Sequence, residues 1–131
     1  MNGRDWRIGL AVAGGAAIGS VLRFAIASVS VAAMGAYFPA GTLAANVIGS
    51  FVIAFVARRL AGRPQKALSG AFWLAGFCGG LTTFSVFSLE TVLFLDEGRA
   101  GTALAYVAVS LVLWLGAAAA GWSAAGRKRG R

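Results

Sequence analysis

Long apolar stretches alternate with short polar segments along this chain. No Asp, Glu, Lys or Arg occurs at positions 24–57, 67–89 or 100–126. Each stretch exceeds the roughly 20 residues that an α-helix needs to cross a bilayer core of about 30 Å. The pattern predicts an all-α membrane protein that forms one domain over residues 1–131. We expect four transmembrane helices, at about 8–34, 41–57, 67–95 and 100–125.

The third predicted helix is interrupted near its middle. Residues 79–88 read GGLTTFSVFS, with two adjacent glycines and four hydroxyl side chains, a poor composition for packing against lipid. Backbone that leaves the helix at membrane depth is stable only where it is buried in protein or lines a polar cavity. We therefore expect a broken helix here, with an ion or substrate path beside it.

Composition supports this class of protein: 59% of residues are hydrophobic, 12% are charged and the mean hydropathy is +0.79. With no histidine and only Cys78, the chain offers no intrachain disulfide, no metal-ligand spacing and no acid–base or nucleophilic constellation. We do not expect an enzyme.

The net charge of +8 reflects topology, because the basic residues gather at the helix ends, and no nucleic-acid partner is predicted. By the positive-inside rule both termini face the cytoplasm, in a multi-pass protein of the plasma or inner membrane. Arg99 alone lies on the other side, and Arg23 lies within the first span. The ten remaining basic residues are Arg4, Arg7, Arg58, Arg59, Arg63, Lys66, Arg127, Lys128, Arg129 and Arg131.

Arg23 is costly at its depth, by about 2.5–3.5 kcal/mol on insertion scales, so it serves a function or extends to the interface. An arginine there attracts anions and repels cations. Thr42 and Asn46 are four apart and share a helix face. The Asn46 amide could donate to an anion without adding charge, or it could join two helices by a hydrogen bond.

Phe84 and Phe87 are three residues apart, and their positive ring edges could face an anion; core packing is the alternative. Ser85 and Ser88 have the same spacing. Glu90 is the acid inside a predicted span, with Arg23 or a partner's arginine as a candidate ion-pair partner. In the fourth span, Tyr106 and Ser110 lie four apart, and the Tyr106 hydroxyl could donate to an anion or pack in the core.

Small residues indicate close helix packing. Gly15 and Gly19 are four apart, as are Gly76 and Gly80, a spacing that lets membrane helices approach each other. Four helices of this size barely enclose a pathway, so we expect the chain to oligomerise.

Three segments carry a resemblance to a known family: residues 14–24, residues 41–46 and, above all, GFCGGLTTFSVFSLE at 76–90. Together they resemble the Fluc (CrcB) family of small fluoride channels over essentially the whole chain. The resemblance implies an antiparallel dimer with two fluoride pores. Fluoride would leave the cytoplasm by passive permeation, which reduces its toxicity.

The resemblance also implies roles for individual residues. A structural sodium ion at the dimer centre would be bound by the backbone carbonyls of Gly79 and Thr82. Trp114, four residues after Ser110, stands where some relatives continue with a hydroxyl, and its role is open. The fluoride pathway would include Arg23, Thr42, Asn46, Phe84, Ser85, Phe87, Ser88, Tyr106 and Ser110.

The charge bias departs from what a homodimer that inserts in both directions requires. We therefore expect this subunit to pair with an oppositely oriented paralogue. Two other functions remain open at this stage: a non-conducting membrane subunit that organises a complex, and a small four-helix multidrug antiporter. The antiporter needs a carboxylate early in the chain, where the first span has Arg23 instead.

Overall fold

The structure, a computed structural model, describes residues 3–126, and it is helical almost throughout. Four spans are long and apolar enough to cross a membrane: Asp5–Met34, Ala40–Leu60, Ala67–Asp96 and Ala100–Gly126. They confirm the predicted four-helix membrane fold. The elements are α1 (Gly3–Met34), α2 (Ala40–Leu60), η1 (Pro64–Lys66), α3 (Ala67–Gly70), the π-helical η2 (Ala71–Cys78), α4 (Gly79–Leu81), α5 (Phe84–Asp96) and α6 (Ala100–Gly126).

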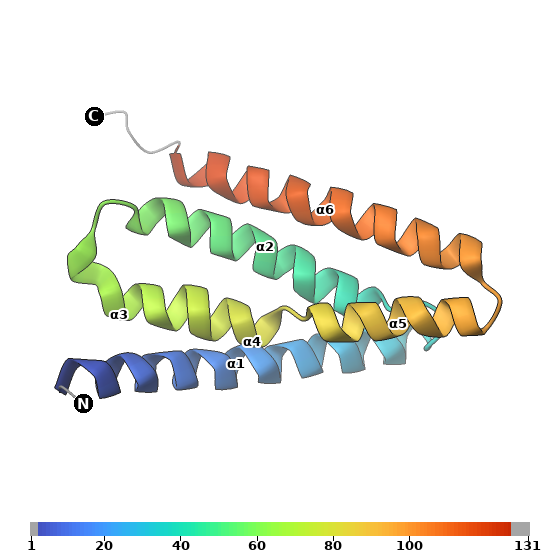
Figure 1. Cartoon of the computed structure of the whole chain (residues 1–131), viewed down its shortest axis with the longest axis horizontal. Helices are drawn as coiled ribbons and strands as arrows, with labels where there is room; N and C mark the ends of the chain where they lie inside the picture. The colour runs from blue at the N-terminus through green and yellow to red at the C-terminus, as the bar shows by residue number, and fades with distance from the viewer. Residues whose placement is uncertain (1–2, 127–131) are drawn as a thin grey trace.

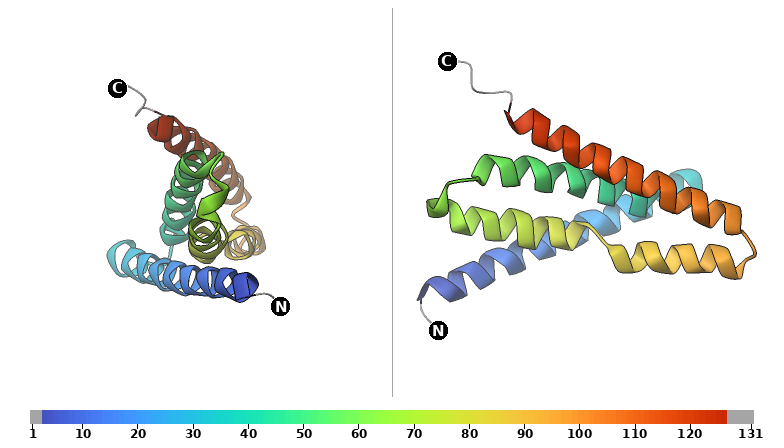
Figure 2. Two further views of the ribbon diagram at one scale, coloured as in Figure 1. Left: turned by 90° about the vertical axis from the view of Figure 1, so that its left-hand side faces the viewer. Right: turned by 45° about the horizontal axis from the view of Figure 1, so that its top comes forward.

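The helices run back and forth along one axis (Figure 1). α2 packs along α6 on one side, and α1 packs against η2 and α4 on the other. Figure 2 shows α1 crossing the remaining helices obliquely. The two ends of the described chain and the α2–η1 connection lie at one end of the bundle, and the other two turns lie at the opposite end. This arrangement places Arg99 at the opposite end from Arg58, Arg59 and Arg63; the C-terminal basic residues at 127–131 lie outside the described part.

The predicted glycine pairs are the contact between α1 and the third span. A Cβ atom added to Gly15 would overlap the Phe72 carbonyl oxygen, and one added to Gly80 would overlap that of Ala16. Gly19 and Gly76 are equally close to backbone across the same interface. The small residues therefore let the two backbones touch, as their spacing predicts.

The third span breaks at Thr82 and Thr83, two residues after the glycine pair. Gly79 keeps helical dihedral angles (φ −64°, ψ −35°), whereas Thr82 (ψ 153°) and Thr83 (ψ 123°) are extended. A new helix then begins at Phe84, where the Thr83 hydroxyl accepts a hydrogen bond from the Val86 N–H at 3.2 Å. Thr83 is thus the N-cap of α5, a position that threonine favours.

The buried core of the single chain is small. It consists of an aromatic cluster between α5 and α6, formed by Phe87, Phe94, Ala103 and Tyr106. Large apolar side chains such as Val21, Phe24, Leu104 and Leu115 are mostly exposed. Exposed apolar surface of this extent is typical of helices that face lipid or another subunit rather than water.

Candidate functional site

Asn46 of α2 bridges the break in the third span. Its side-chain Nδ2 donates to the Thr83 carbonyl at 3.0 Å, and the Thr83 N–H donates to its Oδ1 at 2.8 Å. The side chain is 4% exposed. An Asn amide has two N–H donors, so one remains after the bond to Thr83. Asn46 therefore joins two helices, as one of the two sequence interpretations expects, and still has a donor for a ligand.

The break releases the two backbone carbonyls that the resemblance assigns to sodium. In a continuous helix Gly79 would accept from the Thr83 N–H, and Thr82 would accept from the Val86 N–H. Here the Thr83 N–H donates to Asn46 and the Val86 N–H donates to the Thr83 hydroxyl. Side-chain oxygens thus replace the carbonyls of Gly79 and Thr82 as acceptors. Carbonyl oxygens are the ligands that hard cations prefer, so the residues present fit such an ion.

Glu90 of α5 joins two predicted pathway residues. Its Oε1 accepts a hydrogen bond from the Thr42 hydroxyl at 2.6 Å, and its Oε2 accepts one from the Tyr106 hydroxyl at 2.7 Å. Thr42 and Tyr106 are both buried. The expectation that Glu90 pairs with Arg23 is wrong within the described subunit, because these two hydroxyls hold its carboxylate. Glu90 belongs to the site although sequence reasoning left it out.

The two candidate phenylalanines lie in different surroundings. Phe87 is 6% exposed and packs against Tyr106, with ring centroids 5.1 Å apart. Phe84 is 71% exposed, with its centroid 5.7 Å from that of Phe87. Core packing therefore accounts for Phe87 within one subunit, whereas Phe84 presents its ring to whatever lies outside the subunit.

Two cavities lie beside the break, and Thr83 lines both. One, of about 280 Å³, also involves Asn46, Phe84 and Trp114. The other, of about 240 Å³, is lined by Arg23 and Thr42 among others. Arg23 is half-buried and borders this second cavity. The predicted pathway residues from α1, α2 and α5 thus surround one polar region of the bundle.

The remaining predicted hydroxyls behave differently from one another. Ser110 is fully buried, and its Oγ has no hydrogen-bond partner within residues 3–126. Ser88 donates to the Phe84 carbonyl of its own helix at 2.9 Å. Ser85 is exposed, and neither it nor Ser88 lines the two cavities beside the break. The structure therefore brings Ser110 close to the expectation and leaves Ser85 and Ser88 apart from it.

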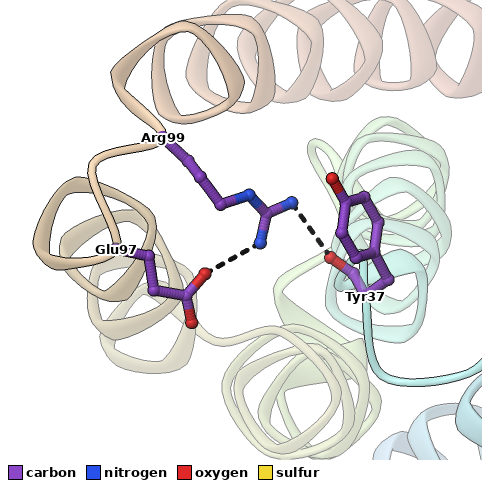
Figure 3. A network of polar contacts seen from close by, with 3 residues as sticks. All are labelled: Tyr37, Glu97 and Arg99. Atoms are coloured by element: carbon purple, nitrogen blue, oxygen red, sulfur yellow. Dashed lines mark hydrogen bonds and ion pairs between the residues drawn. The ribbon is translucent and has the colours of Figure 1, made fainter.

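Arg99 is fixed at the far end of the bundle (Figure 3). Its guanidinium donates to Glu97 at 2.9 Å and to the Tyr37 carbonyl at 3.4 Å. It also lies over the rings of Tyr37 and Phe94, 4.2 and 4.5 Å from their centroids. The hydrogen bond from Glu97 raises the pKa of Arg99 above its usual value. A cavity of about 210 Å³ there reaches from Arg99 to Glu90.

A larger cavity, of about 560 Å³, lies at the opposite, basic end. It is bordered by Arg58, Arg59 and Arg63 together with Trp122. Arg58 donates to the Trp122 carbonyl at 2.7 Å, so its charge stabilises the C-terminal end of α6. This cavity lies apart from the residues around the break, and size alone does not make it the functional site.

The fold and the site define a class: small multi-pass membrane proteins in which a broken helix borders a polar region inside the bundle. The family described as CrcB-like protein, Camphor Resistance (CrcB), matches residues 10–122. The chain belongs to this family.

Characterised relatives cover nearly the same length. The chain is 44% identical to the fluoride-specific ion channel FluC of Nitrobacter winogradskyi over 119 residues, which is 88% of this chain and 93% of the relative. It is 43% identical to fluoride-specific ion channel FluC 3 of Brucella abortus over 134 residues, covering 95% and 97% of the two chains. A further relative is the fluoride-specific ion channel FluC of Azotobacter vinelandii, 43% identical over 115 residues, which is 87% of this chain and 90% of the relative.

Proposed function

We propose that this protein is a fluoride-selective channel that lets cytoplasmic fluoride leave the cell by passive permeation. Family membership and relatives named for fluoride conduction support the ion. The observation that carries the proposal is the bridge between Asn46 and Thr83, because it opens the third helix and keeps one amide N–H available beside two cavities.

The pathway residues would act on the anion in different ways. Arg23 supplies positive potential at the cavity that it borders, which attracts an anion. The free N–H of Asn46 replaces part of the anion's hydration, and the Phe84 ring offers a positive edge. The Tyr106 hydroxyl now donates to Glu90, so it binds fluoride only when that bond opens.

The working unit in this proposal is an antiparallel dimer. Phe84 is exposed in the single chain, and a Cβ atom on Gly79 would meet open space, so both lie on a face that a second subunit could cover. The freed carbonyls of Gly79 and Thr82 would hold sodium where the two broken helices meet. When bound, sodium would supply the positive charge that these carbonyl oxygens lack.

We further propose that the protein resides in the plasma or inner membrane with both termini in the cytoplasm. The described basic residues Arg58, Arg59 and Arg63 share one end of the bundle, opposite Arg99, and this bias favours one orientation. The second subunit of the dimer would then be an oppositely oriented paralogue.

Growth of a bacterial strain that lacks its own fluoride exporter tests the function. We expect this chain, expressed with its paralogue, to restore growth in millimolar-range sodium fluoride, on the order of ten times the concentration that stops the empty-vector strain. Equal sensitivity of both strains, with the protein shown to be in the membrane, would contradict the proposal.

A further inference from the structure

The cavity beside the break contains a donor that the pathway described above does not use. This cavity, of about 280 Å³, is bordered by Trp114 of α6 together with Asn46, Thr83 and Phe84. At about 30 Å³ for each water molecule in the liquid, it has room for several particles the size of water or a small anion. Trp114 is the large polar side chain in this lining that has no role so far.

The Trp114 indole N–H is buried and unpartnered. Its Nε1 atom is inaccessible and has no hydrogen-bond partner within residues 3–126. An indole N–H only donates, so another donor cannot satisfy it. A buried donor without a partner costs about 1–3 kcal/mol, and such groups in native proteins call for a specific explanation, such as a bound water or ion.

Ring packing fixes the indole. Trp114 makes an edge-on contact with Phe87, with centroids 4.8 Å apart and ring planes at 70°. Phe87 in turn contacts Phe84 and Tyr106. The indole is therefore held by aromatic contacts and needs no hydrogen bond for its position, which leaves the N–H to a ligand.

A second unpartnered donor lies one helical turn away. Ser110 is fully buried, and its hydroxyl has no partner among the described residues. Ser88 and Thr91 of α5 each donate to the carbonyl four residues back, so a buried hydroxyl in this bundle has that option. Ser110 and Trp114 are four apart and share a face of α6. Two free donors on one face indicate a ligand that accepts hydrogen bonds.

The donors also select the charge of the ligand. The described residues that line this cavity include no carboxylate, and the side chains of Trp114 and Asn46 both offer N–H groups there. A cation would meet positive hydrogens, whereas an anion would satisfy them. We propose that the Trp114 indole N–H binds fluoride in this cavity, as an additional site in the permeation path. This inference rests on the proposed function.

Replacement of Trp114 by Phe tests the flux. Trp114→Phe removes the N–H and keeps an aromatic ring against Phe87. We expect fluoride efflux from proteoliposomes to fall about tenfold or more, with the melting temperature and dimer assembly unchanged. Trp73→Phe is the matched control, because Trp73 lies on η2 and packs against Phe72 and Phe77, away from this cavity. We expect its flux to equal that of the wild type.

Direct binding is measured with the indole ¹⁵N–¹H resonances of the four tryptophans in the detergent-solubilised dimer. The signal that disappears in Trp114→Phe identifies Trp114. We expect sodium fluoride to shift this resonance and sodium chloride at equal concentration to leave it in place. The shift reports the N–H itself, which a purely structural tryptophan would not change.

The outcomes separate this site from the function as a whole. A wild type that conducts fluoride, with no shift of the Trp114 resonance or with unchanged flux in Trp114→Phe, overturns the site and leaves the channel intact. An N–H that a group of the second subunit already satisfies would give that unresponsive resonance. A fluoride-dependent shift in a protein that conducts no fluoride supports the site and contradicts the proposed function.

Discussion

Phe84 and Phe87 show how residues with one spacing acquire different roles. The sequence predicts both as candidate pathway residues, because they flank the hydroxyl-rich segment. The structure buries Phe87 in the subunit core and leaves Phe84 exposed. A substitution series should therefore separate them.

We expect Phe84→Ile to reduce fluoride flux about tenfold or more, equivalent to about 1.4 kcal/mol of barrier, with little change in subunit stability. Ile retains apolar bulk but has no ring edge. Phe87→Ile should lower flux and also cost about 1–3 kcal/mol in folding stability, because it changes shape in a packed cluster. Efflux assays and thermal melting measure the two effects. Unchanged flux in Phe84→Ile would assign that ring to packing alone.

Asn46 should be sensitive to charge. Asn46→Asp places a negative charge in the pathway and removes the donor to the Thr83 carbonyl, so we expect fluoride efflux to fall to the level of empty liposomes. Ser123→Asp adds the same charge at an exposed position near the basic end and should conduct like the wild type. Wild-type flux from a correctly assembled Asn46→Asp protein would remove Asn46 from the pathway.

Other residues in the site could not be assigned from sequence. Spacing places Thr42 and Asn46 on one helix face, but it does not say which partner each will choose. Glu90 takes the hydroxyls of Thr42 and Tyr106 because α2 and α6 both bring them to α5. Ser88 bonds to its own helix for the opposite reason, since a carbonyl one turn back is always within reach.

At the scale of elements, apolar length and charge placement predict the four helices well. The helices begin and end within a few residues of the expected positions, except that α1 starts at Gly3 rather than near Ile8. The broken helix is also predicted, but its glycines indicate the wrong residues as the break. Gly79 and Gly80 stay helical, and the extended residues are Thr82 and Thr83, because Asn46 on a neighbouring helix takes the Thr83 N–H. A sequence does not show that long-range bond.

The interface between α1 and η2 yields a matched pair of variants. Gly15→Ala would force a Cβ atom into the Phe72 carbonyl, whereas Gly14→Ala meets nothing within 4 Å. We expect Gly15→Ala to destabilise the subunit by about 1–3 kcal/mol, as overpacking does, and Gly14→Ala to be neutral. Melting temperatures in detergent measure the difference. Equal values for both variants would mean that α1 does not pack as the structure shows.

At the scale of the whole molecule, the arrangement of charged ends predicts a single orientation in the membrane. Ala61, beyond α2, is exposed at the basic end, and Ala100 begins α6 at the other end. In cells without the paralogue, Ala61→Cys should react with a membrane-impermeant thiol reagent only after the membrane is opened, and Ala100→Cys should react from outside. The native Cys78 is buried and serves as the background control. Labelling of both positions from outside would show dual insertion and remove the need for a paralogue.

Fluoride efflux from proteoliposomes tests the central claim most directly. The liposomes contain sodium fluoride or sodium chloride and either this chain alone or this chain with its paralogue, and an ion-selective electrode records release. We expect rapid fluoride release with the paralogue, little from the chain alone, and chloride release at the level of empty liposomes in each case. Release from the chain alone would still establish the channel, as a homodimer. Absence of fluoride release from both preparations, with dimers verified in the membrane, would contradict a fluoride channel.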